Sequence, residues 1–285
     1  MSLTGLLQQN LSSGVPYHLI RFLPGKTPLS TWPPVVFAIA GYLLLIFGIQ
    51  EYMQTRKPFE IRGLSQIHNS MLSAGSLILL ALTLEEVVPM VSKHGFHYGI
   101  CSPEAWTPTL ETYYLVNYYI KYVELLDTVF LVLKKKPLTF LHVFHHAATA
   151  VLAFTTFLGK PSMSWFIMLL NLTVHVFMYY YYYAAAARKK IWWKKYITTM
   201  QITQFVIDGL AISYAAFHHF LATYAPFIPN NGHCTTSKPV AALGMFLLAF
   251  YLYLFLGFYG TTYIQPNSKG QKLSIIQICR TFVGI

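Results

Sequence analysis

The sequence predicts an all-α membrane protein with seven transmembrane helices, and three observations carry this prediction. First, 55% of the residues are hydrophobic, only 10% are charged and the mean hydropathy is +0.48, whereas a soluble chain has about 25% charged residues. Second, seven segments approach the ~20 mostly apolar residues that a membrane span needs. Third, the basic residues gather in short linkers on one side of these segments. Together these features divide the chain into a segment 1–33, a seven-span unit 34–264 and a tail 265–285.

The seven apolar segments follow one another at short intervals. They cover residues 34–53, 69–90, 111–133, 138–158, 163–187, 196–220 and 239–264. Basic linkers follow the first segment (residues 56–62), the third (134–136) and the fifth (188–195). The linkers after the second, fourth and sixth segments carry few basic residues, so the two kinds of linker alternate as the chain crosses the membrane.

This alternation gives the orientation. The basic linkers and the tail hold 14 of the 20 Lys and Arg residues, the other side holds five, and Lys121 lies inside the third segment. Because cytosolic loops carry the excess of Lys and Arg, the tail is predicted in the cytosol and the N-terminus across the membrane. Topology therefore accounts for the net charge of +11, and we expect no nucleic-acid partner.

Two of the three cysteines, Cys101 and Cys234, fall in linkers on the non-cytosolic side. Each is the only cysteine of its linker, so a disulfide between them is expected if that compartment is oxidising. Two free thiols are the alternative. The sequence Asn10-Leu11-Ser12 on the same side makes Asn10 a candidate glycosylation site.

Three imidazoles stand out inside the fourth segment. His142, His145 and His146 interrupt an otherwise apolar run, and on a helix their spacing allows them to share one face. Ionisable groups inside a membrane segment are rare and indicate function by default. This stretch is therefore the first candidate for a catalytic site.

The third segment carries Lys121, Glu124 and Asp127 at intervals of three residues. That spacing keeps them near one helical face, and charges in a membrane segment would be costly against lipid. We therefore expect them to face an interior. A structural ion-pair network and a direct part in catalysis are both compatible with this pattern.

Two further polar rows lie in the fifth and sixth segments. The fifth carries Asn171, His175 and Tyr182 on one stripe, beside Tyr179 in a run of five tyrosines. An isolated His is often a hydrogen-bonded core residue, but His175 lies at a depth that suits the other imidazoles. The sixth carries amides that could orient imidazoles or hold a thioester carbonyl; these are Gln201 and Gln204, with Asp208 continuing their row.

Two chemistries suit the histidines. An HxxHH box occurs in membrane di-iron enzymes, and four imidazoles could also hold one zinc; the sequence has no second box, which counts against metal. The other chemistry is acyl transfer, because imidazole can attack a thioester and neighbouring imidazoles can move protons near neutral pH. The phosphates of a coenzyme A could then meet basic residues at the cytosolic side, although topology alone also explains them; these are Lys134, Lys135, Lys136, Arg188, Lys189, Lys190, Lys194 and Lys195.

Four ordered motifs give a family resemblance. They are Lys121-x-x-Glu124-x-x-Asp127-Thr128, His142-x-x-His145-His146, Asn171-x-x-x-His175-x-x-Met178-Tyr179-x-Tyr181-Tyr182 and Thr198-x-x-Gln201-x-x-Gln204-Phe205. In this order and spacing, over about residues 30–265, the chain resembles the ELO family of very-long-chain fatty acid elongases. The stretches 136–141 and 192–194 look most like fungal members, which act mainly on saturated and monounsaturated chains.

The resemblance implies a very-long-chain 3-oxoacyl-CoA synthase, an acyltransferase of the endoplasmic reticulum membrane. Such enzymes condense a long-chain acyl-CoA with malonyl-CoA, releasing CO2 and CoA. The family uses no metal or other cofactor, and six of its seven helices surround an acyl tunnel closed at the lumenal end. Expected partners are the bilayer, the two CoA substrates and the reductase and dehydratase of the elongation cycle, and a homo-oligomer is compatible with the family.

The family's motifs also suggest roles for single residues. His145 would carry the acyl group as an acyl-imidazole, with His142 and His146 orienting it and shuttling protons. His175 would lie against the malonyl unit, while Asn171, Gln201 and Gln204 would supply hydrogen bonds to the oxyanion. A seven-span transporter with a proton relay remains the alternative that is not an enzyme.

Overall fold

The structure is a computed structural model that describes residues 16–228, 232–235 and 237–264. Within these residues all regular secondary structure is helical, which confirms the all-α part of the predicted fold. Two short helices, α2 (Tyr17–Ile20) and α5 (Phe96–Cys101), accompany seven long ones. The long helices are α3 (Trp32–Met53), α4 (Arg62–His94), α6 (Pro108–Leu133), α7 (Phe140–Gly159), α8 (Ser164–Ala186), α9 (Lys194–Tyr224) and α10 (Lys238–Tyr259).

Each predicted segment coincides with one long helix, but two helices run well past the predicted ends. Helix α4 begins at Arg62 rather than at residue 69, so His68 lies inside the helix. Helix α9 continues to Tyr224, four residues beyond the predicted end at 220. Composition located the start of α4 poorly because its first turns are polar.

Five of the described helices are long and apolar enough to cross a membrane by length and composition: α3, α4, α7, α9 and α10 with the turn that continues it to Ile264. The chain is therefore a multi-pass membrane protein. Helix α6 falls outside this group because it carries four charged residues, and α8 because Asn171, His175 and five tyrosines lower its hydropathy. The two exceptions are the helices richest in candidate site residues.

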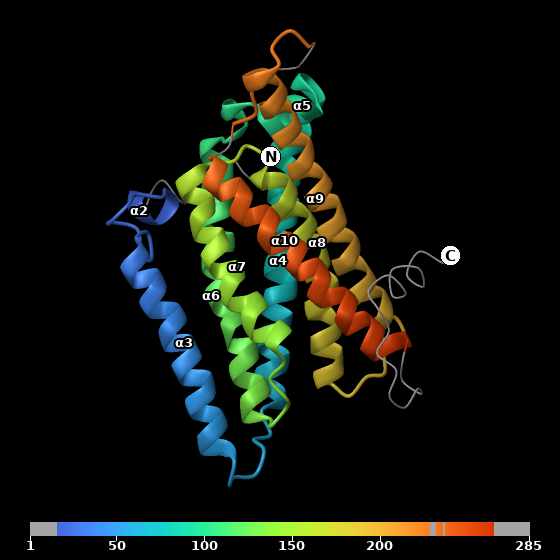
Figure 1. Cartoon of the computed structure of the whole chain (residues 1–285). Helices are drawn as coiled ribbons and strands as arrows, with labels where there is room; N and C mark the ends of the chain where they lie inside the picture. Colours follow the sequence, from blue (N-terminus) through green and yellow to red (C-terminus); the bar gives the residue numbers. More distant parts are fainter. Residues whose placement is uncertain (1–15, 229–231, 236, 265–285) are drawn as a thin grey trace.

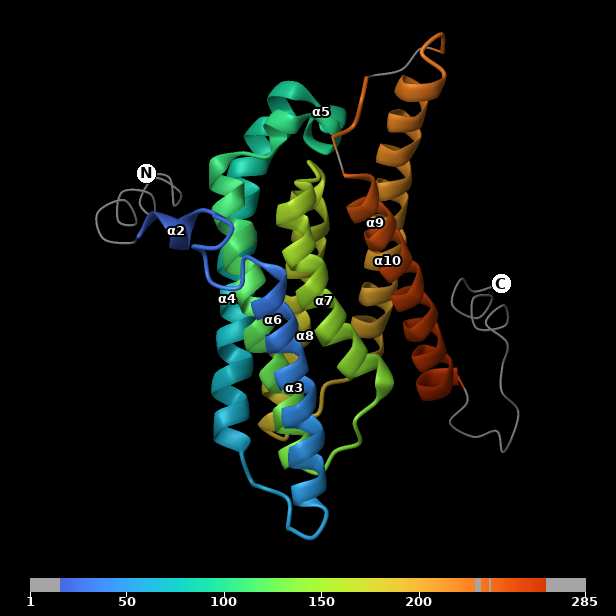
Figure 2. The same cartoon turned by 60° about the vertical axis from the view of Figure 1, so that its left-hand side comes forward.

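Six helices pack in a cyclic order. Helix α4 packs against α8, α8 against α9, α9 against α10, α10 against α7, α7 against α6 and α6 against α4. Helix α3 packs against α6 from outside this group, as Figures 1 and 2 show. Helices α6 and α9 are therefore separated by two helices in either direction and face each other across the interior.

The short elements define the two ends of the bundle. At one end, called here the disulfide end, Cys101 at the end of α5 is joined to Cys234 after α9 by a disulfide. At the other, called here the basic end, lie the linkers 54–61, 134–139 and 187–193. Thr139 caps α7 there, because its side chain accepts a hydrogen bond from the His142 N–H.

Aromatic side chains and one buried carboxylate fill the disulfide end. Phe22, in the segment between α2 and α3, stacks on Phe157 of α7 with ring centroids 4.4 Å apart. Glu111 of α6 accepts hydrogen bonds from the Phe22 N–H at 3.1 Å and from Trp106 Nε1 at 3.0 Å. These contacts tie the N-terminal segment to the ends of α6 and α7, so the interior is packed with side chains at this end.

Candidate active site

Four polar side chains form a closed ring between α6 and α8. Lys121 Nζ donates to Glu124 Oε1 at 3.0 Å and to Asn171 Oδ1 at 2.9 Å. Asn171 Nδ2 lies 3.2 Å from His175 Nε2, and His175 Nδ1 lies 3.2 Å from Glu124 Oε1. Lys121, Glu124 and His175 are all buried. Because each charge meets an opposite charge or an amide, the cost of burying this group in the bundle is offset.

The ring also orients the His175 imidazole. The Asn171 amide presents its oxygen to Lys121, so its nitrogen is the atom that faces His175 Nε2. Nε2 therefore accepts a hydrogen bond and the ring proton lies on Nδ1, beside the Glu124 carboxylate. Nε2 has a hydrogen-bond partner, whereas Nδ1 lies 3.2 Å from the Glu124 carboxylate without forming a hydrogen bond, so the imidazole is positioned mainly through Asn171.

Asp127 belongs to a different contact from the one we expected. The sequence spacing grouped it with Lys121 and Glu124, but its carboxylate lies 2.9 Å from His68 Nε2 of α4 and accepts from the Tyr179 hydroxyl of α8 at 2.9 Å. Asp127 therefore links α4, α6 and α8 one helical turn nearer the basic end. His68 was missed as a site residue because it precedes the apolar part of α4; its place on the buried row with Leu72 was the available signal.

The three histidines of α7 divide into a pair and a single residue. His142 and His146 lie side by side with ring centroids 4.4 Å apart. His145 is nearly perpendicular to His146 at 5.7 Å and lies against α10, 4.9 Å from the ring of Tyr251. Tyr251 was not predicted as a site residue, because a tyrosine in an aromatic-rich helix gives no distinguishing signal.

A polar chamber at the basic end collects most of the predicted site. Its wall includes all four histidines, and Lys194 at the start of α9 lies at its edge. The other predicted residues that line it are Glu124, Asp127, Asn171, Tyr179, Tyr182, Gln201 and Gln204. Residues from four separate motifs therefore meet around one cavity.

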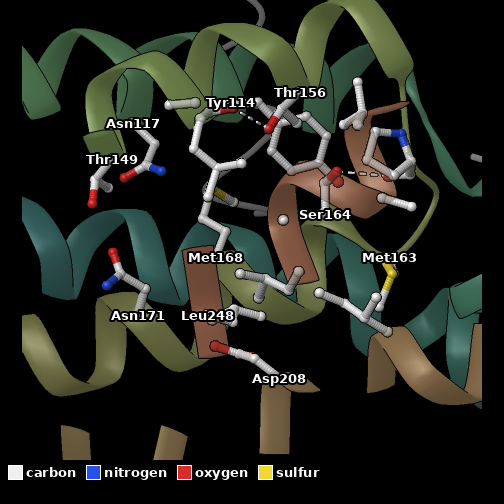
Figure 3. A pocket seen from close by; sticks show the side chains of 18 of the residues that line it. Tyr114, Asn117, Thr149, Thr156, Met163, Ser164, Met168, Asn171, Asp208 and Leu248 are labelled. Carbon is white, nitrogen blue, oxygen red and sulfur yellow. Dashed lines mark hydrogen bonds between the residues drawn. The ribbon is translucent and has the colours of Figure 1, made fainter. Parts of the chain in front are cut away.

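A second, apolar chamber continues from there toward the disulfide end. Its walls are mainly aliphatic and aromatic, and it reaches Phe157, Met163 and Val240. Figure 3 shows part of its lining, with Asn117, Thr149 and Asn171 near one end. The two chambers share four lining residues, His145, Asn171, Gln204 and Phe205. Of the predicted residues, Lys121 lines the apolar chamber and not the polar one.

The two amides of α9 have partners other than the imidazoles. Gln201 Nε2 lies 3.4 Å from Met178 Sδ, and Gln204 Nε2 donates to Asp208 Oδ2 at 3.1 Å. Each amide keeps a second N–H, and Gln204 lines both chambers. Both remain suited to donate a hydrogen bond to a ligand. Among the described residues neither amide forms a hydrogen bond with a histidine, so no contact supports the hypothesis that they orient the imidazoles.

The basic residues differ in whether their side chains already have hydrogen-bond partners in the protein. Lys134 donates to Ser65 at 2.6 Å and Lys135 to the backbone oxygens of Gln54 and Arg56. Partial burial lowers the pKa of Lys134, while the nearby Asp127 carboxylate opposes this effect. The others are exposed around the basic end; these are Lys136, Arg188, Lys189, Lys190, Lys194 and Lys195, the last with its ammonium 5.5 Å from the Tyr259 ring.

Among the described residues, three potential metal ligands come together at the disulfide end. His97, Cys101 and Cys234 have their ligand atoms within 4.8 Å of one another. The two sulfurs are joined in the disulfide, so they are not thiolates that could bind a metal. Of the other predicted sites, Asn10 and the tail 265–285 lie outside the described residues.

Comparison with known proteins identifies the family. Residues 27–271 match the model of the ELO (GNS1/SUR4) family. The chain belongs to the ELO family. It is 44% identical over 249 residues to putative fatty acid elongase 1 of Schizosaccharomyces pombe, covering 87% of this chain and 75% of that protein. It is 33% identical over 253 residues to fatty acid elongase A of Dictyostelium discoideum, covering 87% of this chain and 90% of that protein.

A third relative extends the comparison to animals. Long chain fatty acid elongase 2 of Caenorhabditis elegans is 34% identical over 245 residues, which cover 84% of this chain and 87% of that protein. The resemblance inferred from the four motifs is thereby confirmed. The chain is a member of the fatty acid elongase family, and the two chambers are features of a member of that family.

Proposed function

We propose that this protein is the condensing enzyme of fatty acid elongation. It would join a long-chain acyl-CoA to malonyl-CoA, giving a 3-oxoacyl-CoA two carbons longer, CO2 and free CoA. The observation that carries the proposal is the position of His145, which lines both the polar and the apolar chamber. An acyl chain in the apolar chamber and a CoA in the polar chamber would bring a thioester to this imidazole.

The first step would be acyl transfer to His145. A ring nitrogen attacks the thioester carbon, the carbon–sulfur bond breaks, and CoA leaves as a thiolate that takes up a proton. The His142–His146 pair is suited to carry that proton, because neutral imidazoles can accept and donate protons near neutral pH. Its ring centroids are 4.4 Å apart and His146 adjoins His145.

The second step would form the new carbon–carbon bond. Malonyl-CoA loses CO2, the electron pair of the broken bond becomes an enolate, and its carbon attacks the acyl-imidazole carbon. The tetrahedral centre collapses, the imidazole leaves, and the 3-oxoacyl-CoA is released. The free N–H of Gln204 lies where the two chambers meet and is suited to stabilise the oxyanion.

The buried ring would support this chemistry without reacting. His175 is oriented by Asn171 and lies beside Glu124, and its ring would form the part of the polar chamber's wall against which the malonyl unit lies. No metal or cofactor is required by these steps. The malonyl and acyl carriers would both enter from the basic end, where Lys194 borders the polar chamber and can meet CoA phosphates.

The membrane arrangement follows from the same proposal. We infer seven spans, with α6 and α8 tolerated in the membrane because their polar faces point inward, and six helices forming a barrel around the acyl chain. The basic end would face the cytosol and the disulfide end the lumen of the endoplasmic reticulum. The reductase and dehydratase of the cycle would then receive the product on the cytosolic side.

A microsomal assay tests the function. Labelled malonyl-CoA is supplied with a panel of long-chain acyl-CoAs, for the wild type and for His145→Ala. We expect label in a 3-oxoacyl product that resists chelators and disappears in His145→Ala. Malonyl-CoA is then omitted and intact-protein mass spectrometry looks for an acyl adduct on His145. An adduct on another residue, or activity that a chelator removes and iron restores, would contradict the mechanism.

A further inference from the structure

Two polar side chains in the apolar chamber have an atom with no partner. Asp208 of α9 is fully buried, and its Oδ1 receives no hydrogen bond. Asn117 of α6 has a buried Oδ1 that is also unpaired. Both residues line the apolar chamber, from helices that face each other across it; Figure 3 shows them entering the cavity from different sides.

Leaving such atoms unpaired is costly. A buried polar group without a hydrogen bond has lost its contacts with water and gained none in the protein, and this loss is larger when the group is charged. Asp208 Oδ2 accepts a hydrogen bond from Gln204 Nε2, but this contact leaves the second carboxylate oxygen, Oδ1, without a partner. A ligand that reaches both Asp208 and Asn117 would supply what the protein lacks.

The depth of the two residues fixes where this ligand group must lie. Asp208 follows Gln204 by four residues, and Asn117 precedes Lys121 by four on a helix of opposite direction. Asp208 is therefore one helical turn, or about 6 Å, deeper than Gln204, which lines both chambers, and Asn117 is as far beyond Lys121, which donates a hydrogen bond to the shared residue Asn171. Thr149 stands in the same relation to His145 and also lines the chamber. Asp208, Asn117 and Thr149 therefore define a polar level in the apolar chamber. On an extended acyl chain with its thioester at His145, this level lies several carbons from the thioester.

The surroundings limit the chemistry of that group. Aliphatic side chains surround this level, including Leu248 and, one turn deeper on α9, Ile212. A second carboxylate would be repelled by Asp208, whereas a hydroxyl is neutral and both donates and accepts a hydrogen bond. It can donate to Asp208 Oδ1 and accept from Asn117 Nδ2, and it suits Asp208 in either protonation state.

We propose that the apolar chamber selects acyl chains that carry a mid-chain hydroxyl group, held between Asp208 and Asn117. The inference rests on the proposed function in taking the chamber's occupant to be an acyl chain. The hydroxyl proton supplies the missing partner of Asp208 Oδ1, and the hydrocarbon on either side of it fills the apolar walls. Unsubstituted chains still fit but leave Asp208 Oδ1 unpaired.

Binding tests the inference without requiring condensation. Acyl-CoAs of one length, unsubstituted or with a hydroxyl at successive mid-chain carbons, compete for the purified wild-type protein with a labelled unsubstituted acyl-CoA, in the absence of malonyl-CoA. We expect one narrow range of hydroxyl positions to bind about tenfold tighter than the unsubstituted chain, the effect of about one added hydrogen bond to a polar or charged group.

Variants assign the preference to the two residues. Asp208→Leu and Asn117→Leu should each bring the hydroxyl preference to about one, while Asp208→Asn, which keeps a polar group, should retain part of it. Ile212→Val is the matched control, because it alters the same wall without a polar atom and should leave the ratio unchanged. Using the ratio between two ligands separates this effect from any general loss of binding, and thermal unfolding of each variant reports its folding.

The outcomes separate the two proposals. Equal binding of hydroxylated and unsubstituted chains at every position would overturn the inference. It would indicate that bound water, and not a ligand hydroxyl, forms the hydrogen bonds to Asp208 and Asn117. A preference that persists in Asp208→Leu would overturn it as well. If hydroxylated chains bind tighter but neither chain is extended with malonyl-CoA, the inference stands and the proposed function fails.

Discussion

Asn171 and His175, one turn apart on α8, are joined side chain to side chain, with the amide nitrogen 3.2 Å from Nε2. The same amide accepts from the buried Lys121 ammonium at 2.9 Å. The orientation of the imidazole is thus set by an ion pair on a neighbouring helix. A change in Lys121 is therefore passed to His175 through one amide, while a change in Glu124 also acts directly, because its carboxylate lies 3.2 Å from Nδ1.

Replacing Asn171 by Leu should lower turnover more than substrate binding. The imidazole would lose its Nε2 partner and could rotate, and misplacing a catalytic group by about 1 Å can cost about 100-fold in rate. We expect kcat to fall by 10- to 100-fold with KM within about twofold. Steady-state kinetics with malonyl-CoA as the varied substrate measures both.

Thr173→Val is the control for that change. Thr173 lies on the same helix, bonds only the Leu169 carbonyl at 2.8 Å and lines neither chamber. It should keep wild-type kinetics. Equal losses in Asn171→Leu and Thr173→Val would mean that α8 is sensitive to any substitution and that the amide has no special part.

Removing the Lys121 ammonium should destabilise the fold. Lys121→Met leaves the Glu124 carboxylate buried at 2% exposure without its cation, and breaking a buried ion pair in this way costs about 3–5 kcal/mol. Chemical unfolding in detergent measures the loss. The matched control is Lys160→Met. The Lys160 side chain is 54% exposed and its ammonium lies 3.8 Å from Glu111 Oε2, and an exposed pair contributes only about 0–1 kcal/mol.

The double variant Lys121→Met/Glu124→Gln distinguishes charge from shape. With both charges gone, no unpaired ion is buried, and most of the lost stability should return. Activity should not return, because the Asn171 amide, which orients His175, still lacks the Lys121 ammonium that holds its oxygen. Recovery of both stability and activity would show that the ring has only a structural part.

The sequence predicted the helical class and the approximate positions of the long helices, because these follow from local composition and from the cost of polar groups in apolar segments. Lys121, Glu124, Asn171 and His175 were each assigned to an interior face, and they meet there. Which polar group pairs with which is a property of helix packing. Asp127 shows this, since its spacing matched Glu124 while its partners His68 and Tyr179 come from two other helices.

Residues without a charge or a motif were the ones that sequence reasoning missed. Tyr251 lies in α10 among other aromatic residues, and only the tertiary structure brings its hydroxyl to 3.0 Å from Thr149 and its ring beside His145. Asp208 extended a polar row in the sequence, but whether its second oxygen was satisfied depended on what faces it across the bundle.

Reducing the disulfide should weaken the fold more than it weakens the site. Cys101 and Cys234 are 133 residues apart, and closing a loop of that size restricts the unfolded chain enough to stabilise the fold by about 4–5 kcal/mol in the chain-entropy model. We expect a lower unfolding midpoint with reductant, and the same midpoint with or without reductant in Cys101→Ala/Cys234→Ala. The condensation rate of the reduced protein should stay near that of the wild type at low temperature, because the residues that line both chambers lie far from the disulfide. Loss of activity at temperatures where the reduced protein remains folded would contradict this separation.

The close approach of α7 and α10 at Gly159 should tolerate no side chain. A Cβ built at Gly159 would lie 2.7 Å from Val240 Cγ2 and 2.9 Å from Val240 Cβ, so Gly159→Ala must separate the two helices. Overpacking of this kind costs about 1–3 kcal/mol, and because Val240 lines the apolar chamber, the range of accepted acyl lengths should change as well. Adding Val240→Ala removes the two Cγ contacts and should restore part of the stability, giving a coupling of about 0.5–3 kcal/mol in a double-mutant cycle.

Gly209→Ala is the matched control on α9. A Cβ at Gly209 meets no atom within 4 Å, and Ala is the better helix former by about 0.5–1 kcal/mol, so this variant should be as stable as the wild type or more so. Unfolding midpoints and product chain lengths for the four variants form one experiment. If Gly159→Ala were as stable as Gly209→Ala and made products of the same length, α7 and α10 would have room at this contact and the disulfide end of the chamber would not be set by it.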